Sequence, residues 1–127
     1  MTNHLYDAVF GQHAESDRTF LYTMDGEISF TAFAGLTNRL ANLLIDKGLA
    51  PGDRVAVQAD KSVMLLALYA ATVKAGGVYL PLNTGYTASE LDYFLGDAKP
   101  RIVVVAQTAE AQIAPIAERG GAVLLTL

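Results

Sequence analysis

The sequence contains no cysteine and no tryptophan, and only 17% of its 127 residues are charged. Without cysteine the chain can form neither disulfides nor thiolate metal sites, which fits a reducing compartment, and we predict a cytoplasmic location. Nine lysine and arginine residues stand against thirteen aspartate and glutamate residues, a net charge of −4, and the basic residues form no cluster. A chain of this kind is not suited to follow a phosphate backbone, so we expect no nucleic-acid partner.

Long hydrophobic runs are also missing. The most apolar segment, residues 63–73, is much shorter than the roughly 20 residues that a bilayer requires. The first ten residues include His4 and Asp7 and contain no long apolar core, so they do not resemble a secretory signal. We therefore expect no membrane partner.

What the chain does have is a high hydrophobic content, 52%, which excludes disorder and predicts one domain over residues 1–127. After an amphipathic patch within residues 1–18 and a hairpin over 19–30, strand-like and helix-like segments alternate. Predicted strands cover 55–59, 78–82, 101–105 and 122–127; predicted helices cover 32–47, 62–74, 88–96 and 108–119. This alternation predicts an α/β fold: a three-layer unit with a mostly parallel sheet of about four strands wrapped by helices, plus the N-terminal β-hairpin.

Several local features can be compared with a structure. Asp25-Gly26 suits the tight turn of the hairpin, which we expect to pack at an edge. Thr31 is a candidate N-cap, and Pro115 is expected to kink or break its helix. In the helix over 32–47 we expect a core face of Phe33, Leu36, Leu40, Leu43 and Leu44, with Thr37, Asn38, Arg39, Asn42 and Asp46 facing outward or sideways.

The segment from Thr72 to Leu95 organises the rest of the chain. Gly76-Gly77 ends a helix, residues 78–82 read as a strand that is apolar on both faces, and Thr87 with Glu90 has the spacing of a capping box. The helix before it is apolar on almost every side, so it must be enclosed. Together with the apolar last six residues, this helix predicts a piece of a larger protein.

Residues 75–104, A-G-G-V-Y-L-P-L-N-T-G-Y-T-A-S-E-L-D-Y-F-L-G-D-A-K-P-R-I-V-V, resemble the N-terminal region of acyl-CoA synthetases of the adenylate-forming superfamily. Residues 83–87 and 90–94 most resemble the malonyl-CoA synthetase branch, and the likeness extends over 21–127. Residues 28–33, I-S-F-T-A-F, match the first short motif of the superfamily, with Phe33 in place of the usual leucine.

The resemblance implies an ATP-dependent ligase that adenylates a small carboxylic acid, with malonate favoured, and transfers it to CoA, using ATP, Mg and CoA. The family's phosphate loop and its other catalytic parts have no matching positions here. We therefore expect no catalytic, cofactor-binding or metal-binding residue within 1–127, no cofactor bound to the fragment, and no activity from it alone. Its main partner would be the rest of its own chain, and exposed apolar surface could drive self-association.

Ligands of open α/β sheets bind where strands end and helices begin. Three loops have this position: Asp60-Lys61-Ser62, residues 83–87 and Gln107-Thr108. The middle one is rich in donors, namely Asn83, Thr84, Tyr86, Thr87 and the following Ser89, and could accept an anion at the helix start. A structural role is favoured, because Thr87 and Glu90 already cap that helix.

Other candidate groups also have structural interpretations. Lys74 fits a helix C-terminus, and Tyr93 and Phe94 fit core and edge packing rather than a base-stacking platform. Neither Asp92 with Glu90 nor Asp92 with Asp97 forms a facing carboxylate pair. His4 and His13 are expected to be surface polar residues rather than metal ligands.

Two other classes of protein remain open at this stage. The chain could be a free-standing small α/β binding or scaffold module without catalysis. It could also be a nucleotide-binding domain, although it lacks a glycine-rich phosphate-binding fingerprint.

Overall fold

A four-stranded parallel sheet of order β4-β3-β5-β6 forms the centre of the computed structural model, which describes residues 3–127. Its strands are β3 (Arg54–Gln58), β4 (Val78–Pro81), β5 (Ile102–Val105) and β6 (Val123–Thr126). The predicted parallel α/β fold with four strands is therefore confirmed. Met1 and Thr2, with which the predicted N-terminal patch starts, lie outside the described residues.

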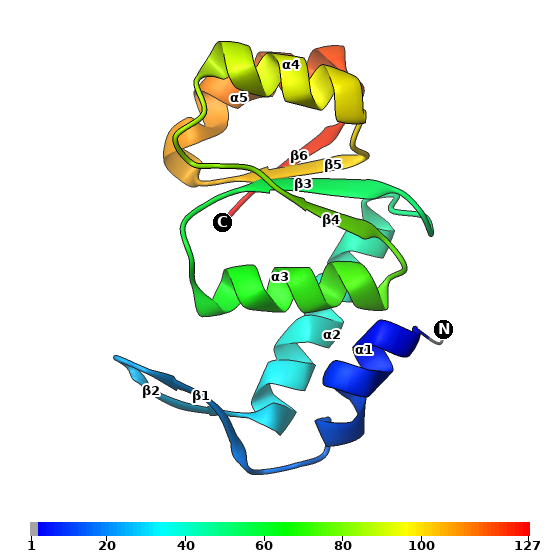
Figure 1. The fold of residues 1–127 in the computed structure, drawn as a ribbon, viewed down its shortest axis with the longest axis vertical. Coiled ribbons are helices and arrows are strands. Elements are labelled where there is room, and N and C mark those ends of the chain that lie inside the picture. The colour runs from blue at the N-terminus through cyan, green and yellow to red at the C-terminus, as the bar shows by residue number, and fades with distance from the viewer. Residues whose placement is uncertain (1–2) are drawn as a thin grey trace.

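Helices cover both faces of this sheet (Figure 1). α4 (Ala88–Ala98) and α5 (Glu110–Arg119) lie on one face, where Leu91, Leu95 and Ile113 pack in one cluster. α3 (Val63–Lys74) and the C-terminal half of α2 (Phe30–Asp46) cover the other. Neighbouring strand residues alternate between the two cores, as the pleat requires. In β3, Val55 and Val57 join the α2–α3 cluster and Ala56 joins the α4–α5 cluster.

A third cluster lies beyond α3, on the side away from the sheet (Figure 1). The cluster contains side chains from α1 (His4–Val9) and from the hairpin strands β1 (Thr19–Thr23) and β2 (Gly26–Ser29). A 3-10 turn (Gly11–His13) follows α1. Phe20 packs edge-on against Phe33 of α2, with 4.8 Å between ring centroids. The hairpin forms its own two-stranded sheet against α2, so its predicted position at an edge was wrong: its aromatic residues find their partners on a helix.

The hairpin turn lies one residue earlier than predicted. Thr23 pairs with Gly26, which leaves Met24 and Asp25 as the two central residues. The Thr23 hydroxyl fixes this register, because it accepts from the Asp25 N–H (3.2 Å) and donates to the Gly26 carbonyl (2.8 Å).

Two predictions for α2 were wrong. Ser29 rather than Thr31 is the N-cap, since its hydroxyl accepts from the Ala32 N–H at 3.1 Å; the Thr31 hydroxyl instead donates to the Ser16 carbonyl at 2.8 Å. The buried face consists of Phe33, Thr37, Ala41 and Leu44, while Leu43 is 40% exposed. Small side chains on this face allow α2 to lie close to α3. Of the predicted core face, Phe33 and Leu44 are buried, and Leu36 and Leu40 pack against the core clusters while partly buried. The prediction was wrong for Leu43, and it missed Thr37 and Ala41.

Thr37 shows most clearly where the predicted and observed core faces of α2 differ. It was expected to face outward or sideways, yet it is completely buried. Its hydroxyl oxygen has no hydrogen-bond partner within residues 3–127. A buried hydroxyl of this kind gives up its hydration without compensation, which makes Thr37 a weak point of the core.

The apolar helix α3 is enclosed, as predicted, and the covering groups come from this chain. Ser62 caps it by accepting from the Leu65 N–H at 3.1 Å, and every residue from Ala67 to Val73 except Tyr69 is buried. These residues contact both the sheet cluster and the N-terminal cluster of Tyr6, Phe10 and Phe33. The apolar character of α3 is therefore explained within residues 3–127 and does not by itself indicate a missing partner.

Three further predictions need correction: the burial of β4, the end of α4 and the effect of Pro115 on α5. β4 is an edge strand, so Val78 is 49% exposed instead of covered on both faces. α4 continues two residues past Gly96, and Lys99 follows it in the left-handed conformation with φ 49°. α5 runs without interruption through Pro115. Burial of Ile113, Ile116 and Ala117 against the sheet offsets the single hydrogen bond that the proline removes.

Alanine substitutions at Gly76 and Gly96 are expected to change the free energy of unfolding in opposite directions. Gly76 has φ +83° in the turn after α3, and alanine there is expected to lower the free energy of unfolding by about 1–2 kcal/mol. Gly96 lies inside α4, where an added Cβ would meet no atom within 4 Å, so Gly96→Ala is expected to raise it by about 0.5–1 kcal/mol. Urea denaturation measures both. A Gly76→Ala variant at least as stable as wild type would contradict this turn geometry.

Candidate functional site

The carboxyl ends of three parallel strands meet around one shallow hollow of ≈ 290 Å³. It is lined by residues from the ends of three strands and the loops that follow them: Gln58 at the end of β3 with Ala59 and Asp60, Thr84 after β4, and Ala106, Thr108 and Ala109 after β5. The sheet topology therefore brings the three loops together. This hollow is our candidate functional site.

Hydrogen bonds within the loop after β4 use most of its polar groups. The Gln58 side-chain amide donates to the Asn83 carbonyl at 3.0 Å, which ties the end of β3 to this loop. The Asn83 side chain accepts from the Gly85 N–H at 2.7 Å. The Tyr86 ring stacks on Phe94 with 4.9 Å between centroids. These groups shape the loop and leave Thr84 as its contribution to the hollow.

The helix start beside the hollow is already satisfied. Thr87 accepts from the Glu90 N–H at 3.2 Å, and the Glu90 carboxylate accepts from the Thr87 N–H at 3.1 Å. The predicted capping box is thus confirmed, and the carboxylate occupies the position that an anion would take. A structural role for this helix start stays our prediction.

Gln58 was missed as a site residue from sequence because it reads as the last residue of a strand. It is one of few buried polar side chains in the described part of the chain. A polar residue that closes an apolar strand immediately before a loop was the available signal.

Replacing Gln58 with leucine is expected to lower the free energy of unfolding by about 0.5–1.5 kcal/mol, because the Asn83 carbonyl loses one of its two donors and keeps only the Tyr86 N–H. The loop after β4 should then be cut faster by protease, and limited proteolysis with mass analysis would locate the cut. Thr108→Val is the matched control, since Thr108 is an exposed residue of the same hollow. Equal effects from the two substitutions would show that the Gln58 contact does not hold the loop.

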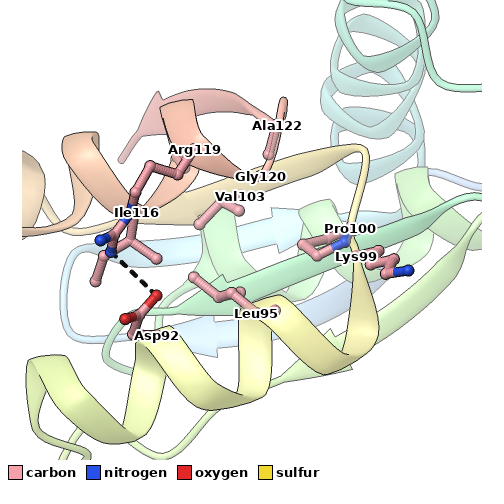
Figure 2. A pocket seen from close by; sticks show the side chains of 11 residues that line it. Asp92, Leu95, Lys99, Pro100, Val103, Ile116, Arg119, Gly120 and Ala122 are labelled. Atoms are coloured by element: carbon pink, nitrogen blue, oxygen red, sulfur yellow. Dashed lines mark hydrogen bonds and ion pairs between the residues drawn. The ribbon is translucent and has the colours of Figure 1, made fainter.

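A second concavity, of ≈ 400 Å³, lies between the C-terminal halves of α4 and α5, toward the amino ends of the strands (Figure 2). Leu95, Val103 and Ile116 form its apolar floor. Asp92 and Arg119 form an ion pair across it at 3.1 Å, and both side chains are largely exposed. These two charges therefore satisfy each other, and Lys99 is the one further charged side chain in the lining, which gives the concavity no convergent set of polar groups typical of a substrate site.

Basic side chains gather at the amino ends of the strands. Arg54, Lys99 and Arg101 line a polar hollow there. The Arg54 guanidinium donates to the carbonyl of Ala98, at the end of α4, at 2.7 Å. Arg101 lies against Gly48, just after α2. Cations at helix C-termini offset the negative end of the helix dipole, so these contacts serve the fold.

The remaining candidates have the following places. Lys74 lies in the last turn of α3, as predicted for a dipole partner; it also donates to the Asn38 side chain and stands 4.9 Å from the Tyr6 ring centroid. Phe94 packs against Tyr86 as predicted, and the Tyr93 ring meets Phe94 edge-on with 5.5 Å between centroids. Tyr93 is 72% exposed, so this packing is at the surface and not in the core. His4 is exposed, and His13 packs against Phe30 with 4.9 Å between their ring centroids.

Acid–base and metal chemistry find no support at the candidate site. Burial raises the pKa of Tyr79, and burial followed by the nearby Asp7 charge raises that of Tyr6; neither tyrosine lines the hollow. Within residues 3–127 no three His, Cys, Asp or Glu side chains are grouped to hold a metal ion. The same range contains no helix with the length and apolarity to cross a bilayer.

The family model described as "AMP-binding enzyme" matches residues 10–126. The chain therefore belongs to the AMP-binding enzyme family of adenylate-forming ligases. The family recognised from residues 75–104 is confirmed.

Among solved structures, the chain is similar to MatB from Rhodopseudomonas palustris, a malonyl-CoA synthetase. The identity is 46% and the TM-score 0.94 over 99% of this chain, both for the apo form and for the ATP-bound form. Among curated relatives, the chain is 35% identical over 113 residues to the probable non-canonical nonribosomal peptide synthetase CymA of Salinispora arenicola, which is 87% of this chain. It is 46% identical over 65 residues, 51% of the chain, to enterobactin synthase component F of Shigella flexneri.

All of these relatives are much longer. The chain spans 26% of the apo MatB chain, 1% of CymA and 5% of enterobactin synthase component F. What those proteins do as wholes thus depends largely on segments with no counterpart in these 127 residues.

Proposed function

We propose that residues 1–127 form the N-terminal part of the large domain of an ATP-dependent acyl-CoA ligase, placed before the family's phosphate loop. The observation that carries this proposal is the match to MatB, with 46% identity over 99% of the chain. Matches to the peptide synthetases cover less of the chain or are weaker. In this role the chain supplies four strands and the loops at their carboxyl ends.

The intact enzyme would use malonate. Its carboxylate would attack the α-phosphate of ATP, with pyrophosphate leaving, and the CoA thiol would then displace AMP from the acyl-adenylate. ATP is supported by the ATP-bound MatB structure. Mg, which the resemblance also implies, would neutralise the phosphate charges. A cytoplasmic location belongs to the same proposal.

The candidate site supports a passive role for this chain. Asp60, Thr84 and Thr108 surround the hollow, but no lysine or histidine lines it. Such a site has no group to neutralise a transferring phosphoryl group. The catalytic groups would come from the rest of the enzyme, so the chain alone should be inactive.

The direct test incubates the 127-residue protein with malonate, ATP, Mg²⁺ and CoA and measures AMP by chromatography, with MatB as the positive control. We expect no AMP above the rate without protein. Clear turnover would show that the chain carries its own catalytic groups, contrary to the proposal.

A second candidate is part of an amino-acid-adenylating unit of a peptide synthetase, favoured by the 46% identity over 65 residues to enterobactin synthase component F. The CoA ligase and the peptide-synthetase unit would differ in the acid that they adenylate and in the acceptor of the acyl group. Pyrophosphate exchange by the full reading frame with malonate, but not with amino acids, would support the CoA ligase. The opposite result would support the peptide synthetase.

The free-standing binding module predicts something different, namely a ligand bound by the 127 residues alone. Isothermal titration of the chain with ATP or malonate would detect it. A reading frame that continues past Leu127 into a glycine-rich, lysine-containing loop would exclude this alternative.

A further inference from the structure

The two concavities at the amino ends of the strands meet at the C-terminal end of α4. The apolar one, of ≈ 400 Å³, and the polar hollow, of ≈ 460 Å³, share Lys99, Pro100 and Gly120 in their linings. In Figure 2, Lys99 and Pro100 lie at one end of the apolar concavity, beyond Leu95. The two therefore form one continuous surface with an apolar part and a basic part, which we call the α4–α5 groove.

The α4–α5 groove is built by connections inside the chain. Its lining comes from the turn before β3, from α4 and the segment that leads into β5, and from the end of α5 with the turn before β6. Leu127 follows β6 at the opposite, carboxyl end of the parallel strands. The shape of the groove is thus independent of the last residues of the sequence.

The apolar part has room for a small apolar group. Leu95, Val103 and Ile116 form its floor, and its volume lies within the range of roughly 300–1,000 Å³ that is common for small-molecule pockets. Gly96 lines it without a side chain, and an added Cβ there would meet no atom within 4 Å. Covering this floor would remove apolar surface from water, which favours an apolar ligand.

The basic part carries a local surplus of positive charge. Arg54, Lys99 and Arg101 line it, and Asp53 is the one carboxylate in the same lining. The C-terminal ends of α4 and α5 add roughly half a negative charge each. About one positive charge therefore remains uncompensated, in a chain whose net charge is −4. One carboxylate would balance it.

The arginine and lysine side chains have donors for such an anion. A guanidinium carries several N–H groups, and Arg54 uses one of them on the Ala98 carbonyl. Guanidinium groups bind a carboxylate through two parallel hydrogen bonds. Lys99 lines both parts of the groove, so an anion held by its ammonium would have the apolar floor beside it.

We propose that the α4–α5 groove binds a small apolar carboxylic acid, with the carboxylate against Arg54, Lys99 and Arg101 and the apolar part over Leu95 and Val103. A neutral apolar molecule would leave the positive charge without a counter-charge, and a small polar anion would leave the floor exposed to water. This site lies at the end of the strands opposite the candidate functional site, and the inference does not depend on the proposed ligase function.

The test titrates the ¹⁵N-labelled protein with hexanoate and follows the amide chemical shifts. Acetate supplies the same carboxylate without the apolar chain, and hexanol supplies the chain without the charge. Hexanoate should bind more tightly than either, and the shifted amides should cluster at residues 99–101 and 120–122. Equal binding of hexanoate and hexanol would overturn the proposal. So would shifts confined to the apolar hollow that Leu43 and Leu125 line on the α2–α3 face.

Lys99→Asn tests the basic part. It removes the charge, and asparagine tolerates the left-handed backbone of this position at φ 49°. Hexanoate should bind about twofold to fivefold more weakly, as expected for the loss of one exposed ion pair, and hexanol binding should not change. Lys61→Asn is the matched control, since Lys61 is exposed in the loop after β3, at the other end of the strands. Equal effects of the two substitutions on hexanoate would contradict the proposed site.

Gly96→Leu tests the apolar part. The leucine side chain would occupy part of the concavity, so hexanoate should bind more weakly while circular dichroism and Tm show a folded chain. Unchanged hexanoate binding by the folded Gly96→Leu variant would show that the apolar chain of the ligand lies elsewhere.

Discussion

Replacing Leu44 with alanine is expected to lower the free energy of unfolding by about 2–5 kcal/mol. Leu44 is 1% exposed and belongs to the cluster that joins α2 and α3 to Val55, Ile102 and Val104 of the sheet. The substitution removes most of a buried side chain at the place where a helix meets two strands, and tightly packed neighbours can fill only part of the space. Chemical denaturation monitored by circular dichroism measures the change.

Leu43 provides the matched control, because the same substitution one residue earlier has a different environment. Leu43 is 40% exposed, so Leu43→Ala should cost less than about 1 kcal/mol. The leucine pattern of the sequence assigns both residues to the core, and the structure separates them. Equal costs for the two would mean that α2 is rotated about its axis from the position described above.

Replacing Ala70 with leucine is expected to cost about 1–3 kcal/mol. Ala70 is fully buried where α3 meets the N-terminal cluster of Tyr6, Phe10 and Phe33. A leucine there needs space that the aromatic rings already occupy. The substitution therefore tests whether the N-terminal segment of this chain covers α3.

Met64→Leu in the first turn of α3 is the control for this second prediction. Met64 is 39% exposed, so a change of similar volume should leave stability within about 0.5 kcal/mol. If Ala70→Leu were equally harmless, the outer face of α3 would be open in solution. The apolar helix would then again indicate a missing partner.

The sheet could be predicted from sequence because its signals are local. Short apolar segments at 55–59, 78–82 and 101–105 alternate with capped helices, and such an order is typical of a parallel sheet wrapped by helices. Ser62 and the pair Thr87–Glu90 mark helix starts through contacts within four residues, so no tertiary knowledge was needed.

Other features depend on which segments meet, and sequence patterns do not contain that information. Val78 reads as buried but is exposed because β4 is at an edge. Thr37 reads as a surface residue but is buried because α2 packs on α3 through its small side chains. Likewise, the hairpin contacts a helix rather than the sheet, and Phe20 has no local signal for this.

Some features of the candidate site could likewise be predicted from sequence, and others could not. The meeting of the three loops follows from parallel strands, whose carboxyl ends share one edge. The contact from Gln58 to Asn83 joins residues that are 25 positions apart and appears only in the folded chain. The family was recognisable because residues 75–104 contain a run of turn, strand and cap residues in an order that resembles the family's N-terminal region.

The central claim is that this chain is the non-catalytic N-terminal part of an adenylate-forming ligase. The most direct measurement replaces the matching quarter of Rhodopseudomonas palustris MatB with residues 1–127 and follows AMP release with malonate, ATP, Mg²⁺ and CoA. We predict malonate-dependent AMP release by the hybrid and none by the 127-residue chain alone. A hybrid that folds and melts like MatB but releases no AMP would contradict the claim.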